Sequence, residues 1–197
     1  MVIPHIDFLE LSENKSAYVR ILIPLETCLD SYHTEENFGI FRMRKGDIWI
    51  LESQVPHSAY NLSSDNRRIL SIDFQYKDEI NPDYSRIFKD KSIHNESFEP
   101  AMVHRVKLEQ EDLKDYLQML STQFKEKFDA ENILLKLANL QIRYDSLVSD
   151  IYENLIQVAK LTKNQELISH AMSMKRFYIG QRVMDERFIL RKDLLEA

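Results

Sequence analysis

The chain changes its hydrophobic period near Lys107, and this change restricts the folds that are open to it. Before that point, short apolar and β-branched runs alternate with turn-forming residues, as in a β-sandwich or barrel. From Lys107 onward, leucines and isoleucines recur at the spacing of amphipathic helices. The sequence therefore predicts an α+β protein with a strand-rich core over 1–78, an irregular connection over 79–106 and a helical subdomain over 107–197.

About six strands are expected in the first part. They are residues 2–11, 17–23, 38–44, 48–51, 57–60 and 67–76. Pro24 is expected to end the second strand, and the polar stretch 29–37 is expected to be a loop. A double-sheet jelly roll has eight strands. We therefore expect a partial double-stranded β-helix, jelly-roll or cupin-like, whose first strands would lie ahead of Met1 and are missing from this chain.

Four apolar stripes predict four helices in the last part. They are Leu113 to Phe124, Ile133 to Leu147, Ile151 to Ala159 and a stretch from about Gln165 to Phe188. Such stripes are much more often packing faces than cofactor-binding sites. The helical subdomain is therefore expected to cover the strand core or its mouth.

Composition excludes several classes of function. The net charge of −6 argues against a nucleic-acid-binding protein, which would carry a basic stripe. Cys28 is the one cysteine, which excludes a disulfide framework and a cysteine zinc site and suits a reducing cytoplasm. No apolar run approaches the length of a membrane helix, and no signal peptide is recognisable. With only three glycines, the chain contains neither a GxGxxG nor a Walker loop.

Two histidines, a carboxylate and an arginine form the most informative motif. His5 and Asp7 are two residues apart, so on a strand both side chains point to one face. With His57 as a distant third ligand they would form the two-His-one-carboxylate triad that holds Fe(II). Arg67 could return on a neighbouring strand and bind a carboxylate through its planar fork. The plainer alternative is that His5 is an ordinary polar residue and His57 caps the turn after Pro56.

Several segments, in order, resemble one enzyme family. They are residues 2–11, 18–20, 46–51 and 57–61, then Arg67 and Asp73, and finally the tail 176–188. This pattern is similar to the bacterial free-proline hydroxylases of the L-proline 3-hydroxylase type, which are non-haem Fe(II)/2-oxoglutarate dioxygenases. The resemblance spans nearly the whole chain and lacks the N-terminal portion that such enzymes carry ahead of the H-x-D motif.

The resemblance implies a role for each matching position. His5, Asp7 and His57 would ligate iron, and Arg67 would bind the distal carboxylate of 2-oxoglutarate. Arg20 would assist in binding the co-substrate. His33 would help to bind a carboxylate of the co-substrate or of the amino acid, and Asn61 would line the pocket or serve the following turn. Trp49 is expected to pack in the core. One position departs from the family, because the usual Arg-x-Ser is Arg67-Arg68-Ile69 here; Arg68 should point to the other face.

The first functional hypothesis is thus a cytoplasmic hydroxylase of a free amino acid, with L-proline the leading substrate at C3 or C4. It would use Fe(II), 2-oxoglutarate and O2, and release succinate and CO2. A related enzyme could act on another amino acid or on an aspartyl or asparaginyl side chain. A second hypothesis is an inactive remnant that binds metal or a partner, with an open strand edge that favours a homodimer. A third is a cupin-like metal protein that does not use 2-oxoglutarate.

Overall fold

The structure is a computed structural model that describes residues 1–7, 18–51, 55–75 and 101–180. The described residues form eight strands and four helices. The strands are β1 (Val2–His5), β2 (Tyr18–Glu26), β3 (Ser31–Glu35), β4 (Gly39–Arg42), β5 (Trp49–Leu51), β6 (His57–Asn61), β7 (Arg68–Gln75) and β8 (Ala101–Met102). The helices are α1 (Gln110–Ser121), α2 (Asp129–Arg143), α3 (Asp150–Thr162) and α4 (Gln165–Ile179). The expected α+β class is confirmed.

The strands form two antiparallel sheets. One has the order β1-β6-β3-β4-β8 and the other the order β5-β2-β7. A small apolar cluster that includes Leu22, Phe41 and Leu51 joins the two sheets, and the ring of Phe41 stacks on Trp49 with centroids 4.4 Å apart. Trp49 therefore packs in the core, as predicted.

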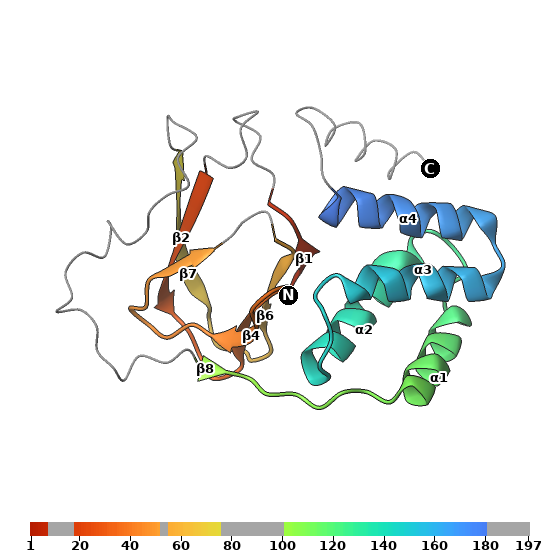
Figure 1. Cartoon of the computed structure of the whole chain (residues 1–197), viewed down its shortest axis with the longest axis horizontal. Helices are drawn as coiled ribbons and strands as arrows, with labels where there is room; N and C mark the ends of the chain where they lie inside the picture. Colours follow the sequence, from red (N-terminus) through yellow and green to blue (C-terminus); the bar gives the residue numbers. More distant parts are fainter. Residues whose placement is uncertain (8–17, 52–54, 76–100, 181–197) are drawn as a thin grey trace.

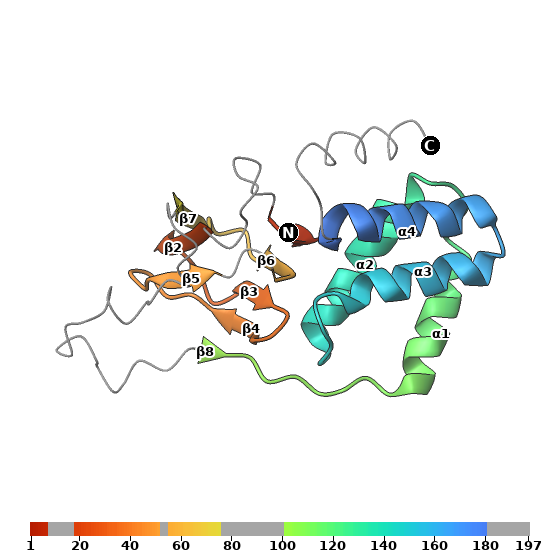
Figure 2. The ribbon, with the colours of Figure 1, turned by 45° about the horizontal axis from the view of Figure 1, so that its top comes forward.

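The four helices lie beside the five-stranded sheet (Figure 1). Their apolar faces form the largest core cluster, which also contains Tyr60 of β6 and packs against Ile3 and Tyr32. In a second view the helices remain on the side of β1 and β6, while β7 lies farther away (Figure 2). The prediction of four packed helices is therefore confirmed, and the predicted end of the last one at Phe188 lies outside the described residues.

Two local predictions are wrong. The stretch 29–37 contains strand β3, which lies between β6 and β4 and buries Ser31, His33 and Thr34. The sequence did not predict β3 because its buried side chains are polar, so it lacks the apolar alternation that marks a strand. Pro24 does not end β2, which continues to Glu26. β5 pairs with β2 only over residues 20–22, so on that side β2 has no neighbouring strand at Pro24. A residue without an N–H is tolerated at such an edge.

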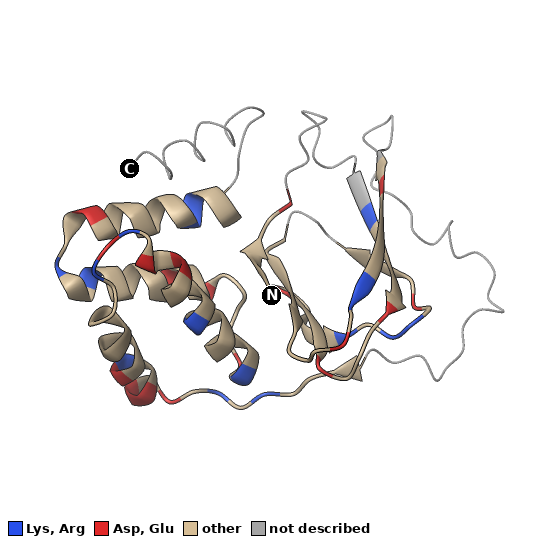
Figure 3. Ribbon diagram, turned by 180° about the vertical axis from the view of Figure 1, so that it is seen from behind, with Lys and Arg blue, Asp and Glu red and all other residues tan. Residues whose placement is uncertain are grey.

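The strand count also differs from the prediction. The structure adds β3 to the expected strands, and a short strand, β8, arises in the connection that was expected to be irregular. Residues 76–100 of that connection lie outside the described residues. Acidic and basic residues are interspersed along the strands and helices (Figure 3), as in the pairs Lys175–Glu153 and Arg68–Glu26. Among the described residues, no helix combines the length and the apolar character that crossing a membrane requires.

Candidate metal centre

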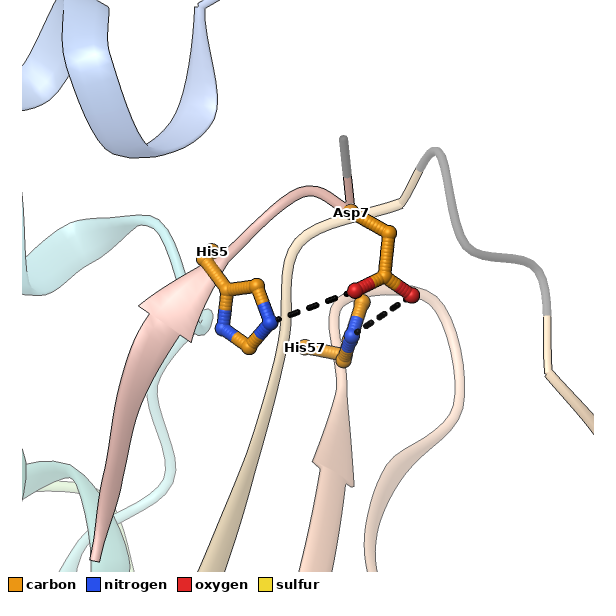
Figure 4. Close-up of side chains that lie close together, drawn as sticks. All are labelled: His5, Asp7 and His57. Carbon is orange, nitrogen blue, oxygen red and sulfur yellow. Dashed lines mark ion pairs between the residues drawn. The ribbon is translucent and has the colours of Figure 1, made fainter. Parts of the chain in front are cut away.

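His5, Asp7 and His57 come together at the inner side of the five-stranded sheet (Figure 4). The Nε2 atom of His5 lies 3.4 Å from Asp7 Oδ1, and the Nε2 atom of His57 lies 3.5 Å from Asp7 Oδ2. One potential ligand atom from each residue lies within 4.8 Å of the others. This is the cluster that the H-x-D spacing and His57 predicted, although Asp7 follows the end of β1 instead of lying in it.

A β-bulge in β1 aims His5 at this cluster. Val2 pairs with Ala59 and His5 pairs with His57, so β1 uses two intervening residues where β6 uses one. Such a bulge turns the following side chain relative to simple alternation. As a result, Ile3 packs against the helical core, whereas His5, two residues later, joins the metal cluster.

Backbone carbonyls fix the orientation of both imidazole rings. The Nδ1 atom of His5 donates to the carbonyl of Ile3 at 2.8 Å, and that of His57 donates to the carbonyl of Val55 at 2.8 Å. A donating Nδ1 leaves Nε2 as the lone-pair nitrogen, which is the form that ligates a metal. Both Nε2 atoms face Asp7, so the three donors converge.

Arg20 holds the carboxylate of Asp7 from the opposite sheet. Its guanidinium donates to Asp7 and makes two bonds to Asp73, Nε to Oδ1 at 2.7 Å and Nη2 to Oδ2 at 2.8 Å. Burial alone would raise the pKa of Asp7, but the close contacts with His5 and His57 and the charge of Arg20 hold that pKa well below its usual range. The hydrogen bond to Asp73 is the largest cause that raises the pKa of Arg20. Asp7 is therefore an ionised, oriented carboxylate that could serve as a ligand, and Arg20 has two carboxylate partners within the protein.

His33 lies deeper, beside His57. It is 3% exposed, and its ring stacks on that of His57 with centroids 6.0 Å apart. Burial, together with the neighbouring His57 and Arg67, lowers the pKa of His33 to about 3. Neither ring nitrogen has a hydrogen-bond partner among the described residues. His33 is thus a neutral imidazole with unused hydrogen-bonding capacity close to the metal cluster.

Arg67 directly precedes β7 and is partly buried. Burial lowers its pKa, and nearby Cys28 opposes that shift. Among the described residues, no hydrogen bond or ion pair to its side chain is found. Arg68 is different, since it is exposed and pairs with Glu26 at 3.2 Å, which agrees with the prediction that it points to the other face.

Comparison with known proteins connects this geometry to a family. The sequence model described as "L-proline 3-hydroxylase, C-terminal" matches residues 84–186, which is more than half of the chain. The chain belongs to this L-proline 3-hydroxylase family. Two relatives from Streptomyces sp, L-proline cis-3-hydroxylase 2 and L-proline cis-3-hydroxylase 1, are 30% and 28% identical over 96% of the chain. L-proline cis-4-hydroxylase from Rhizobium meliloti (strain 1021) is 29% identical over 94% of the chain.

The chain spans about two thirds of the length of these curated relatives, namely 64% of each cis-3-hydroxylase and 62% of the cis-4-hydroxylase. The match to the family model and to these relatives confirms the family resemblance that the sequence segments suggested.

Within the L-proline 3-hydroxylase family pattern, Asn61 has a local structural role. Its Nδ2 donates to the carbonyl of Asp65 at 2.6 Å, and its Oδ1 accepts from the backbone N–H of Ser63 at 3.4 Å. Of the two roles considered for Asn61, the structure supports the turn. Whether Asn61, Arg20 or His33 also contacts a bound molecule stays a prediction.

One residue of the site had no role assigned from the sequence. Asp73 belonged to the family-like pattern, but its function follows only from the register that pairs it with Arg20 across β2 and β7. A signal was present, because Asp73 is the one charged residue in the largely apolar run from Ile69 to Phe74.

Proposed function

We propose that this chain forms the metal centre of an Fe(II)/2-oxoglutarate-dependent dioxygenase that hydroxylates a free amino acid, with L-proline the leading substrate. The observation that carries the proposal is the convergence of His5, Asp7 and His57, with both imidazoles held so that Nε2 is available. The printed names of the relatives, cis-3- and cis-4-hydroxylases of L-proline, support the reaction class and the substrate. Under this proposal the two sheets correspond to the partial jelly roll of such enzymes. The protein would act in the cytoplasm.

The donor set suits Fe(II). Two neutral imidazole nitrogens and one carboxylate oxygen are the ligands of the facial triad of non-haem iron oxygenases. Facial ligands with bonds of about 2.0–2.2 Å lie about 3 Å from one another, close to the 3.4 and 3.5 Å that separate the two Nε2 atoms from the carboxylate of Asp7. Bound at this site, Fe(II) with 2-oxoglutarate and O2 would supply the hydroxylation of an unactivated C–H bond, with succinate and CO2 as co-products.

The protein's own residues would contribute orientation and charge. Arg20 fixes Asp7 by direct donation, so the carboxylate does not have to reorganise when a cation arrives. Arg67 would bind the distal carboxylate of 2-oxoglutarate, since a partly buried guanidinium that has no hydrogen-bond or ion-pair partner among the described residues is stabilised by an incoming anion. The missing serine of the family pattern is Ile69, which packs against the apolar cluster between the sheets and cannot donate to that carboxylate.

His33 would serve as a neutral hydrogen-bonding group. Its nitrogens are free among the described residues, and its ring lies next to His57. A neutral imidazole can donate from one nitrogen and accept at the other. It would therefore contact a carboxylate of the co-substrate or the amino acid without adding a buried charge.

The first experiment is an anaerobic titration of the purified chain with Fe(II) and 2-oxoglutarate, following the visible charge-transfer band of a chelated keto acid. We expect a band that disappears in Asp7→Ala. Arg67→Ala should require a higher concentration of 2-oxoglutarate by about 10- to 100-fold, the value of a charge-assisted hydrogen-bonded pair. Arg68→Ala is the matched control, since this neighbouring arginine is exposed and should not change the titration.

Three results would count against the proposal. No band from a well-folded sample would refute the dioxygenase assignment for this chain and favour the inactive remnant. A band that Arg67→Ala leaves unchanged would remove the role of Arg67, and metal binding without a keto-acid band would favour a cupin-like metal protein. With the band established, L-proline and O2 should yield hydroxyproline and succinate in equal amounts by mass spectrometry.

A further inference from the structure

Two of the three clustered ligands depend on an edge strand. β1 ends the five-stranded sheet, and β6 is its one neighbour among the described strands. The pairing with β6 is interrupted by the bulge between Val2 and His5, and Asp7 lies beyond the strand. Sheet hydrogen bonding alone therefore holds the H-x-D backbone weakly, because a bulge leaves residues out of the ladder.

The helices hold this segment from the other side. The phenolic O–H of Tyr152, on α3, donates to the carbonyl of Pro4, and the backbone N–H of Ile6 donates to the carbonyl of Tyr178, on α4, at 2.8 Å. The two tyrosine rings stack with centroids 5.9 Å apart and an interplanar angle of 23°. Hydrogen bonds from the helical part thus reach the residues immediately before and after His5.

Tyr152 is well suited to fix a backbone position. Its side chain is completely buried in the helical core, so its ring cannot move without disturbing that packing. Pro4 has no N–H, which leaves its carbonyl as the one backbone group of that residue able to make a hydrogen bond. The hydroxyl of Tyr152 donates to this carbonyl, which lies in the bulge that orients His5.

We propose that Tyr152 is a positioning residue for the metal centre. Its hydrogen bond to Pro4, assisted by the ring of Tyr178, sets the path of the bulged backbone and thereby the places of His5 and Asp7 relative to His57. The inference rests on the proposed function, because it assumes that these three residues ligate a metal. It assigns to the helical subdomain a part in metal binding beyond covering the strands.

The test compares two conservative variants. Tyr152→Phe keeps the ring and removes the hydroxyl. Tyr60→Phe is the matched control, since Tyr60 is equally buried in the same core and its hydroxyl donates to Gln141 Oε1 of α2 at 3.1 Å instead of to the backbone of β1. Both proteins are titrated anaerobically with Co(II), whose visible spectrum reports the ligand geometry, and both are unfolded by urea.

Tyr152→Phe should bind Co(II) about tenfold more weakly than the unmodified chain and show an altered spectrum, as expected when a group that orients metal ligands is lost. Tyr60→Phe should lose similar stability and keep the unmodified affinity and spectrum. A second variant, Tyr178→Leu, removes the stacked ring but leaves the hydroxyl of Tyr152, and should weaken binding in the same direction by a smaller factor.

The outcomes separate this inference from the proposed function. If the unmodified chain binds Co(II) and both Tyr152→Phe and Tyr178→Leu bind it equally well with the same spectrum, the positioning role is overturned and the metal centre stands. If Tyr60→Phe weakens binding as much as Tyr152→Phe, the effect is general loss of stability and the inference fails. An unmodified chain that binds no Co(II) or Fe(II) overturns both.

Discussion

Acidification should destabilise the metal-free protein through His33. The pKa of this buried imidazole is lowered from its ordinary value of 6.5 to about 3. Between these values the unfolded chain binds a proton that the folded chain excludes, so the free energy of unfolding falls as the pH falls below 6.5. On going from about pH 7 to about pH 5, roughly 1.5 pH units lie below 6.5, and each lowers the free energy of unfolding by about 1.4 kcal/mol. The total loss is about 2 kcal/mol.

His33→Phe isolates this contribution. Phenylalanine is similar in size and does not titrate, and the substitution removes no hydrogen bond that the described residues make to the ring. Asp7, whose pKa is lowered, loses stability only nearer its ordinary value of about 4, and the half-buried His170, whose pKa burial also lowers, is present in both proteins.

Urea unfolding of both proteins with a chelator present, at about pH 7 and about pH 5, gives the comparison. The free energy of unfolding of the unmodified chain should fall by about 2 kcal/mol more than that of His33→Phe over this interval. An equal fall in the two proteins would show that His33 is protonated in the folded state at pH 5. It would then have a solvent path or an anionic partner, and the description of a neutral buried imidazole would be wrong.

Two further substitutions test other parts of the molecule. Arg20→Gln removes the donor that orients Asp7, so Co(II) affinity should fall about tenfold, and an unchanged affinity in a titration would contradict that role. Asn164→Ala removes the side-chain acceptor of the Glu166 N–H at the start of α4. Thermal or urea unfolding should show that the free energy of unfolding falls by about 1 kcal/mol, and metal affinity should not change. A loss of metal affinity equal to that of Tyr152→Phe would mean that α4 as a whole controls the site.

The helical half was predictable because its signal is local. Each helix places apolar residues at intervals of three and four, and the cluster of Leu134, Leu137, Ile151 and Leu155 is the core that this spacing predicts. The cluster of candidate metal ligands was predictable for a different reason. Few side-chain types bind Fe(II), and the chain has only six histidines, so the order of His5 and His57 around Asp7 carries information.

The parts that could not be predicted depend on pairing between distant residues. Strand β3 has a polar sequence whose burial follows from its neighbours β6 and β4, and Arg20 and Asp73 meet only through the register of β2 with β7. The bulge in β1 is likewise a property of two strands, since Val2 and His5 are set by their partners Ala59 and His57. Local sequence does not contain that information.

The same reasoning explains why the helices matter to the site. Four hydrogen-bonded contacts among the described residues join the helical part to the strand-rich part: Tyr152 to Pro4, Ile6 to Tyr178, Tyr60 to Gln141, and Ser149 to Glu36. The carboxylate of Glu36 accepts from both the backbone N–H of Ser149, at 2.9 Å, and its hydroxyl. Two of them lie within two residues of a clustered ligand. An edge strand interrupted by a bulge has few groups of its own with which to hold a precise geometry. Since binding a metal requires its ligands to be held in place beforehand, the helical core supplies the rigidity that the edge strand lacks.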